Sequence, residues 1–309
     1  MPSRRRFLSL LSGLALAKPC AALAETAPAA VGPVKVVATF SILGDFVREV
    51  GGERVALTTL VGADGDAHVY SPSPADARTV ASARLVVSNG LGFEGWIERL
   101  VRSSGGKAVL LRASRGVRAV GEENRRPHGH AHNGDADPHA WHSVANAKVY
   151  VSNIRDALSQ ADPEGRGVFE ANAAGYLARL DALDAEIRAA MARIPPDKRR
   201  VVTSHDAFAY FERAYGLDFV ALQGVSTEAE ASAKDVARVV GQVRREKVPA
   251  VFPENVGGAR LMEQVARETG VRVGGRLYSD ALSAPGGPAA TYLDMMRHNL
   301  RTLTEALSG

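Results

Sequence analysis

Three histidines and one aspartate recur along the chain, each after a short segment with the pattern of a buried strand. They are His68, His139, His205 and Asp280, at intervals of 71, 66 and 75 residues. Ligands of open α/β sheets bind at the carboxyl ends of strands, so side chains placed there can converge. Three imidazoles and one carboxylate form a plausible four-ligand set for a divalent metal ion. A single loop histidine is more often solvated than ligating, so the prediction depends on the four residues occurring together.

The elements that must position these residues alternate between strand and helix in both halves of the chain. Apolar, β-branched segments are followed by stretches of helical period, which predicts parallel sheets with helices on both faces. We expect Ser41 to cap the first helix and Ser73 and Pro74 to open the second. We find no close sequence repeat between the halves. The expected strands are 34–39, 55–61, 85–87, 108–111, 201–202, 219–222, 250–252 and 271–273, and the expected helices are 42–50, 93–101, 143–161, 207–215, 232–246, 258–269 and about 288–307.

The longest helical pattern covers residues 163–194 and ends at Pro195 and Pro196. A helix of about 30 residues would span roughly 45 Å, more than one small domain needs. We interpret it as a linking helix between an N-terminal α/β lobe, 31–162, and a C-terminal α/β lobe, 195–309. A long surface helix within one domain is the alternative. Its apolar stripe consists of Phe169, Tyr176, Leu180, Leu183, Ile187 and Met191.

Residues 112–138 interrupt the alternation with a polar stretch that contains His128, His130 and His132. Such a composition predicts a mobile surface loop. Histidine at every second position suits auxiliary metal capture. The alternative is a loop whose polar residues only keep it soluble.

Residues 1–24 are typical of an export signal, with a basic start, a short apolar run and a small-x-small cleavage site before Glu25. The segment Ser3 to Leu8 fits the twin-arginine pattern, and a general secretory signal is the alternative. Four of the 38 Lys and Arg residues lie in this segment, which leaves 34 basic against 34 acidic residues beyond it. The exported chain is therefore near neutral, and the case for nucleic-acid binding loses its main support.

The single cysteine, Cys20, precedes the expected cleavage near Ala24. A lipoprotein signal needs a small or apolar residue directly before the cysteine, and Lys18-Pro19 fits poorly. Without Cys20 the exported chain has no thiol, so nitrogen and oxygen must hold any metal ion.

Four sequence motifs occur in order along the chain: Asp66 to Pro74, Asp137 to Trp141, His205 to Phe211 with Tyr215-Gly216, and Leu277 to Asp280. Together they resemble the periplasmic metal-binding (solute-binding) proteins of zinc and manganese ABC importers. The resemblance covers nearly the whole exported chain and implies a fold of two parallel-sheet α/β lobes bridged by one long rigid helix. It also implies that His68, His139, His205 and Asp280 hold a metal ion in the cleft between the lobes.

The chain departs from the family pattern after Trp141, where His142-Ser143 replaces the usual Leu-Asp. His142 is either an accidental neighbour or a residue that supports the ligands. We expect His298, in the last helix, to be a surface or packing residue.

The donor set favours Zn²⁺ over Mn²⁺, since zinc outranks manganese in intrinsic affinity at such sites. The resemblance points the same way, because manganese-selective members often carry glutamate at the position of His205. Manganese is the alternative, and iron is a further one. A secreted zinc hydrolase, with Asp280 off the metal and Glu254 or Asp206 as base, has no supporting His-Glu-x-x-His motif. A secreted protein with a purely structural metal is a third class.

The resemblance implies a non-enzymatic, periplasmic, zinc-type protein that delivers its metal to an ABC transporter permease in the inner membrane. A periplasmic metallochaperone is a second candidate partner. We expect a monomer that binds no nucleic acid.

Overall fold

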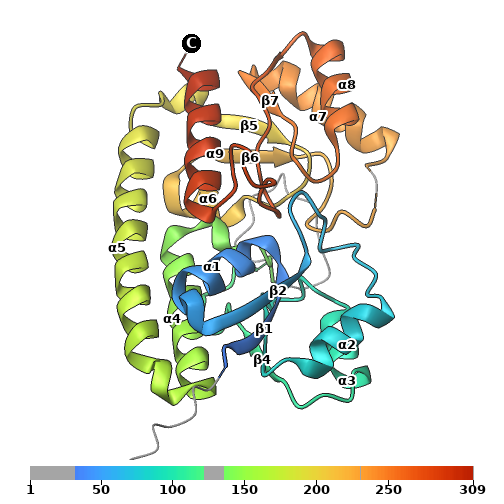
Figure 1. Ribbon diagram of the computed structural model, residues 1–309. Coiled ribbons are helices and arrows are strands. Elements are labelled where there is room, and N and C mark those ends of the chain that lie inside the picture. The colour runs from blue at the N-terminus through green and yellow to red at the C-terminus, as the bar shows by residue number, and fades with distance from the viewer. Residues whose placement is uncertain (1–31, 122–135, 230, 309) are drawn as a thin grey trace, which may run out of the picture. The chain divides into compact units, whose positions relative to one another are not determined.

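Two four-stranded sheets with parallel strands carry the fold, and helices alternate with their strands along the chain (Figure 1). The computed structural model describes residues 32–121, 136–229 and 231–308. The predicted export signal and His128, His130 and His132 lie outside these ranges. Residues 33–309 form one compact unit, so the lobe boundaries at 162 and 195 stay a prediction.

The first sheet has the strand order β2-β1-β3-β4, so β2 and β3 lie on opposite sides of β1 and the sheet has a topological switch point between β1 and β3. Its central strand β1 is valine-rich and almost wholly buried, as a strand covered on both faces must be. The elements of this half are β1 Val34–Phe40, α1 Ser41–Gly51, β2 Val55–Val61, α2 Pro74–Ser82, β3 Leu85–Ser88, α3 Ile97–Ser103, β4 Val109–Arg112 and α4 Val144–Ala161.

The second sheet repeats this topology with the order β6-β5-β7-β8. Amphipathic helices cover it; α7, for example, buries Val236, Val239 and Val243 against the sheet. The two halves thus share an architecture that no sequence repeat reveals. The elements are β5 Arg200–Thr203, α6 Ala209–Tyr215, β6 Asp218–Ala221, α7 Ala233–Glu246, β7 Ala250–Phe252, α8 Ala259–Thr269, β8 Arg272–Val273 and α9 Tyr292–Leu307.

Helix α5, Arg166–Met191, is the long helix that the sequence predicts, and it runs beside α4 and α9 (Figure 1). It has 26 residues and so a length of about 39 Å. It is shorter than expected because Pro163–Gly165 forms a separate 3-10 turn and residues 192–194 form a turn and a bend. The larger apolar core extends from the first sheet through α5 to α9. The last helix therefore also joins the two halves.

Several expected helix starts are wrong: α6, for example, begins at Ala209 and not at residue 207, and three others have an identified cause. Ser41 is the first residue of α1 and not its cap; its hydroxyl accepts a hydrogen bond from Leu282 N instead. Residues 93–96 form turns before α3, because the buried carboxylate of Glu94 binds the backbone of the preceding loop. The last helix begins at Tyr292, where Thr291 provides the cap. In contrast, Ser73 and Asp76 form the capping box of α2, with Pro74 in the first turn.

The described ends of the predicted loop 112–138 are packed against the protein. Val120 N donates to the Tyr210 hydroxyl, and Asp137 N donates to Val120 O. The predicted mobility therefore does not apply to these ends. Within the described ranges, no helix has the length and apolar composition that crossing a bilayer requires.

Candidate metal centre

The four residues singled out in the sequence come together at the carboxyl edges of the two sheets. His68 follows β2, His139 follows β4, His205 follows β5 and Asp280 follows β8. One donor atom from each lies within 4.8 Å of the other three. This convergence agrees with the rule that α/β sheets bind ligands at the carboxyl ends of their strands.

The donor atoms are the Nε2 atoms of the histidines and the carboxylate of Asp280. Oδ2 of Asp280 lies 3.1 Å from His205 Nε2 and 3.3 Å from His68 Nε2, and Oδ1 lies 3.5 Å from His139 Nε2. The Nε2 atoms of His68 and His139 are 3.2 Å apart. A tetrahedral zinc ion with bonds of about 2.0–2.1 Å has edges of about 3.3 Å. These four separations are close to the edges of such a tetrahedron.

Burial of these polar groups costs free energy unless a cation binds between them. His139, His205 and Asp280 are fully buried, and His68 is 9 % exposed. Both oxygens of Asp280 and Nε2 of His205 have no hydrogen-bond partner among the described residues. Buried polar atoms are normally satisfied, so these orphaned atoms point to a bound ion.

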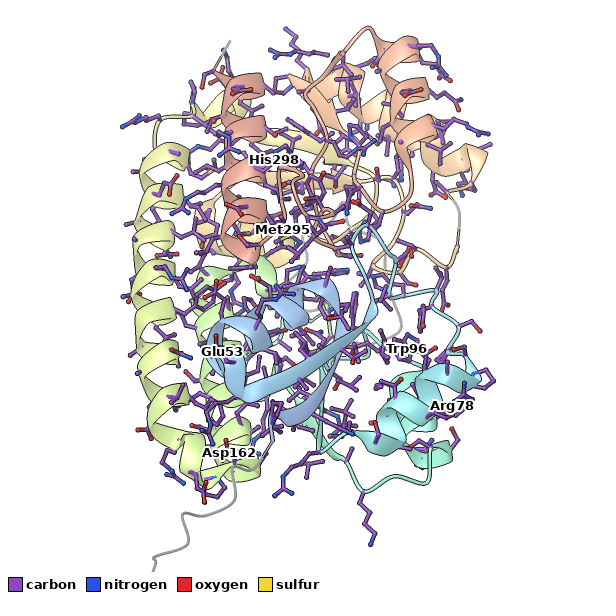
Figure 2. The ribbon with its side chains drawn as sticks, viewed as in Figure 1. Glu53, Arg78, Trp96, Asp162, Met295 and His298 are labelled. Carbon is purple, nitrogen blue, oxygen red and sulfur yellow. The ribbon has the colours of Figure 1, made fainter. Side chains whose placement is uncertain are left out.

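Backbone contacts hold His68 and its neighbours in an irregular segment. The carboxylate of Asp66 accepts a hydrogen bond from His68 N at 2.9 Å. The indole N–H of Trp96 donates to Ala67 O, and Trp96 is labelled in Figure 2 beside α2 and α3. Asp64, whose φ of +53° lies in the left-handed region, donates its N–H to Leu282 O of the other half.

Carboxylates orient two of the three imidazoles. Asp137 Oδ1 lies 2.9 Å from both N and Nδ1 of His139. Glu254 Oε1 accepts from His205 N at 2.9 Å, and its Oε2 lies 2.7 Å from His205 Nδ1. A partner on Nδ1 fixes the ring and makes Nε2 a stronger donor to a metal ion.

The charges of the cluster shift its pKa values strongly. Burial lowers the pKa of His205, but Glu254 and Asp280 outweigh it and raise that pKa well above its ordinary value. Burial raises the pKa of Asp280, but His205 and His139 bring it well below its ordinary value. Because a histidine must be deprotonated to bind a metal ion, a cation at this site competes with protons.

His142 does not belong to the four-residue cluster, and we do not assign it as a ligand. Its ring packs between Trp141 and Phe208, with centroids at 5.7 and 4.6 Å. Burial, and then the nearby His139, lower its pKa to about 3, so it is a neutral buried ring. His298 is likewise apart from the cluster: it lies on α9, with Nε2 3.0 Å from Arg276 O.

The sequence did not assign the residues that support the ligands. Glu254 was considered only as a hydrolytic base, yet it lies on the Nδ1 side of His205, behind the donor atoms. It follows β7 at the same sheet edge, which is the signal that could have found it. Asn255 was missed as well; it binds Ser279 N and Ala281 O on either side of Asp280.

Known proteins resemble this chain in sequence, and solved structures resemble it in fold. The family described as "Zinc-uptake complex component A periplasmic" matches residues 36–306. Manganese-binding lipoprotein MntA of Halalkalibacterium halodurans is 36% identical over 275 residues, covering 89% of each chain. Iron-binding protein YfeA of Yersinia pestis is 33% identical over 286 residues, which cover 92% of this chain and 90% of that protein. The structure of the periplasmic zinc binding protein TroA from Treponema pallidum superposes with a TM-score of 0.83 at 31% identity, covering 89% of this chain and 99% of that one.

Proposed function

We propose, because this chain belongs to the family of periplasmic metal-binding proteins of ABC importers, that the cluster of His68, His139, His205 and Asp280 binds the metal that is imported. The chain is a solute-binding protein and not an enzyme, and its family implies an ABC transporter as partner. The observation that carries the proposal is the set of buried donors with the unpaired oxygens of Asp280. With Asp280 among the donors, the coordination position that a hydrolytic water needs is filled.

Zinc is the ion that this donor set should bind most tightly. Three imidazole nitrogens and a carboxylate suit zinc, and the separations of 3.1–3.5 Å between Asp280 and the histidine nitrogens are close to the edges of a tetrahedral zinc ion. At nitrogen and oxygen sites zinc also exceeds manganese and iron in intrinsic affinity. The proposal that zinc is the cargo rests on this affinity.

Manganese is the second candidate, and the names of the relatives support it better than zinc. MntA and YfeA are named for manganese and iron, and the structural relative TroA for zinc. Both oxygens of Asp280 face histidine nitrogens, so a bidentate carboxylate would give five donors for a larger ion. Selection in the cell depends on metal availability as well as affinity. Zinc can therefore bind more tightly in solution while manganese is transported.

The deciding experiment measures the metal content of protein exported from its own host, and the affinities of the mature protein for Zn²⁺ and Mn²⁺. We expect one equivalent of metal in the wild type and in His298→Ala, and its loss in His205→Ala and Asp280→Ala. Uptake of radioactive zinc and manganese by cells without the protein then identifies the cargo. Full occupancy in Asp280→Ala would contradict the four-ligand site.

The location outside the cytoplasm follows from the family, whose description is periplasmic. We propose that a twin-arginine signal is removed near Ala24. Relatives named as lipoproteins support the alternative of a lipid on Cys20. The intact mass of the exported protein separates a chain that begins at Glu25 from a lipidated one.

Auxiliary metal capture by His128, His130 and His132, which lie outside the described residues, remains a proposal from the sequence. A periplasmic metallochaperone as a second partner and a monomeric state are likewise proposals from the sequence.

A further inference from the structure

One ligand of the candidate metal site borders a cavity. The cavity has a volume of about 400 Å³. His68 lines it together with residues 91–93 and Gly95 of one half and Val225, Ser226 and Glu228 of the other. His68 is 9 % exposed, whereas His139, His205 and Asp280 are fully buried. A metal ion that enters or leaves through this cavity meets His68 before the other donors.

The wall formed by residues 89–96, which we call the Phe93 loop, is held rigidly. The buried carboxylate of Glu94 accepts hydrogen bonds from Asn89 N, Gly90 N and the Thr39 hydroxyl. Phe93 packs against His68 with a centroid distance of 4.5 Å and against Trp141 at 5.0 Å. Gly90, Leu91 and Gly92 all have φ between +55° and +86°, a backbone conformation that the Glu94 bonds stabilise. This wall cannot move without breaking buried contacts.

The opposite wall, residues 222–229 between β6 and α7, touches the His68 segment through a hydrogen bond between distant residues. The Thr227 hydroxyl donates to Asp66 Oδ2 at 2.7 Å, and the two residues are 161 positions apart. Asp66 Oδ1 accepts from His68 N at 2.9 Å. One carboxylate therefore holds both the backbone of a candidate ligand and the wall that faces it.

We propose that Thr227 is a latch residue: its bond to Asp66 closes the cavity wall over His68, and metal exchange occurs through the cavity when this bond breaks. The inference rests on the proposed function. Breaking the bond separates Thr227 from Asp66 and loosens the segment of His68, while backbone hydrogen bonds at residues 222–224 and the fully buried donors stay in place. Thr227 is half-buried, so water can replace Asp66 as the partner of its hydroxyl. The latch is thus weak enough to open repeatedly and sets the rate of metal release.

The test compares Thr227→Val with Thr227→Ser in the mature, metal-loaded protein. Valine keeps the shape but has no hydroxyl, and serine keeps the hydroxyl. We expect Thr227→Val to transfer Zn²⁺ or Mn²⁺ to excess chelator about tenfold faster than the wild type, as for the loss of one hydrogen bond to a charged acceptor. Thr227→Ser should release metal at nearly the wild-type rate. The readout is the rate constant in stopped-flow chelator exchange.

Thr79→Val is the matched control, because the hydroxyl of the half-buried Thr79 bonds within α2 to Ala75 O. It should leave the release rate unchanged. If Thr227→Val releases metal at the wild-type rate, the latch proposal is wrong, but the proposed metal site is not affected. Equal acceleration by Thr79→Val also overturns it, since general loosening then explains the effect. A wild type that binds no metal overturns the proposed function itself. If Thr227→Val does not fold, Thr227→Ala carries the same comparison.

Discussion

At the scale of single residues, the candidate centre consists of donors and of the groups that orient them. Glu254 contacts His205 twice, at its backbone N–H and at Nδ1. Asp137 does the same for His139. The repeated arrangement indicates that the imidazoles are held before the metal arrives, which limits the entropy lost on binding.

Glu254→Gln should weaken metal binding by about 10- to 100-fold, the usual effect of losing a carboxylate behind a histidine ligand. The amide oxygen can still accept from His205 N, but the negative charge beside Nδ1 is gone. Competition with a chelating dye measures the affinity. Glu246→Gln is the control, because Glu246 belongs to the same half and pairs with Arg200. Equal affinities for the two variants would mean that Glu254 is not needed to orient His205.

At the scale of the elements, α1 and α9 meet at a buried carboxylate. Asp45 on α1 accepts a hydrogen bond from Tyr292 N, at the start of α9, at 2.9 Å. The ring of Phe46 packs against that of Tyr292 with centroids 4.8 Å apart. Met295 and His298 follow on α9 (labelled in Figure 2), and Met295 is fully buried. This joint ties the last helix to the first half of the chain.

Burial, partly opposed by the Tyr292 N–H, raises the pKa of Asp45 from 3.8 to about 6. The folded state thus binds the proton more tightly than the unfolded state, so this group costs stability as the pH rises from 4 through about 6. Asp45→Asn keeps an acceptor for Tyr292 N and removes the buried charge. We expect the variant to be more stable than the wild type by about 1–3 kcal/mol at pH 7.5.

Urea unfolding of metal-free protein at pH 7.5 and pH 4.5 measures this difference, which should shrink at the lower pH. Asp197→Asn, at an exposed position, is the control and should show no such change. A variant that is less stable than the wild type at pH 7.5 would show that the ion pair with Arg48 outweighs the cost of burial.

At the scale of the whole molecule, the candidate ligands come from both halves of the chain. His68 and His139 follow strands of the first sheet, and His205 and Asp280 follow strands of the second. The larger apolar core also contains residues from both halves, including Val37 and Phe211. A bound ion therefore links segments that the core already joins, and metal binding should stabilise the entire unit.

Metal at about 1,000 times its dissociation constant should stabilise the folded protein by about 4 kcal/mol, because it binds only the folded state. This gain should raise the thermal unfolding midpoint of the mature protein by about 10 °C. Differential scanning calorimetry checks this, and we expect one transition with and without metal. The shift should disappear in Asp280→Ala and persist in His298→Ala. A metal-induced shift in only one of two separate transitions would show that the halves unfold independently.

The sequence by itself determined the fold class, the alternation of strand and helix, the long helix and the four candidate ligands. These follow from local patterns: apolar periodicity sets the elements, and the carboxyl end of a strand places the residue after it. His68, His139, His205 and Asp280 could thus be predicted although no two of them are neighbours in the chain.

Only the tertiary structure decided which residues meet across long separations. Glu254 lies 49 positions from His205, and Thr227 lies 161 positions from Asp66. The hydroxyl of Ser41 accepts a hydrogen bond from Leu282 N and does not cap its own helix. Glu94 binds Asn89 N and the Thr39 hydroxyl, so residues 93–96 do not form the expected helix. In each case a buried polar group must find a partner, and which partner lies within reach depends on the packing of distant segments, which no local pattern contains.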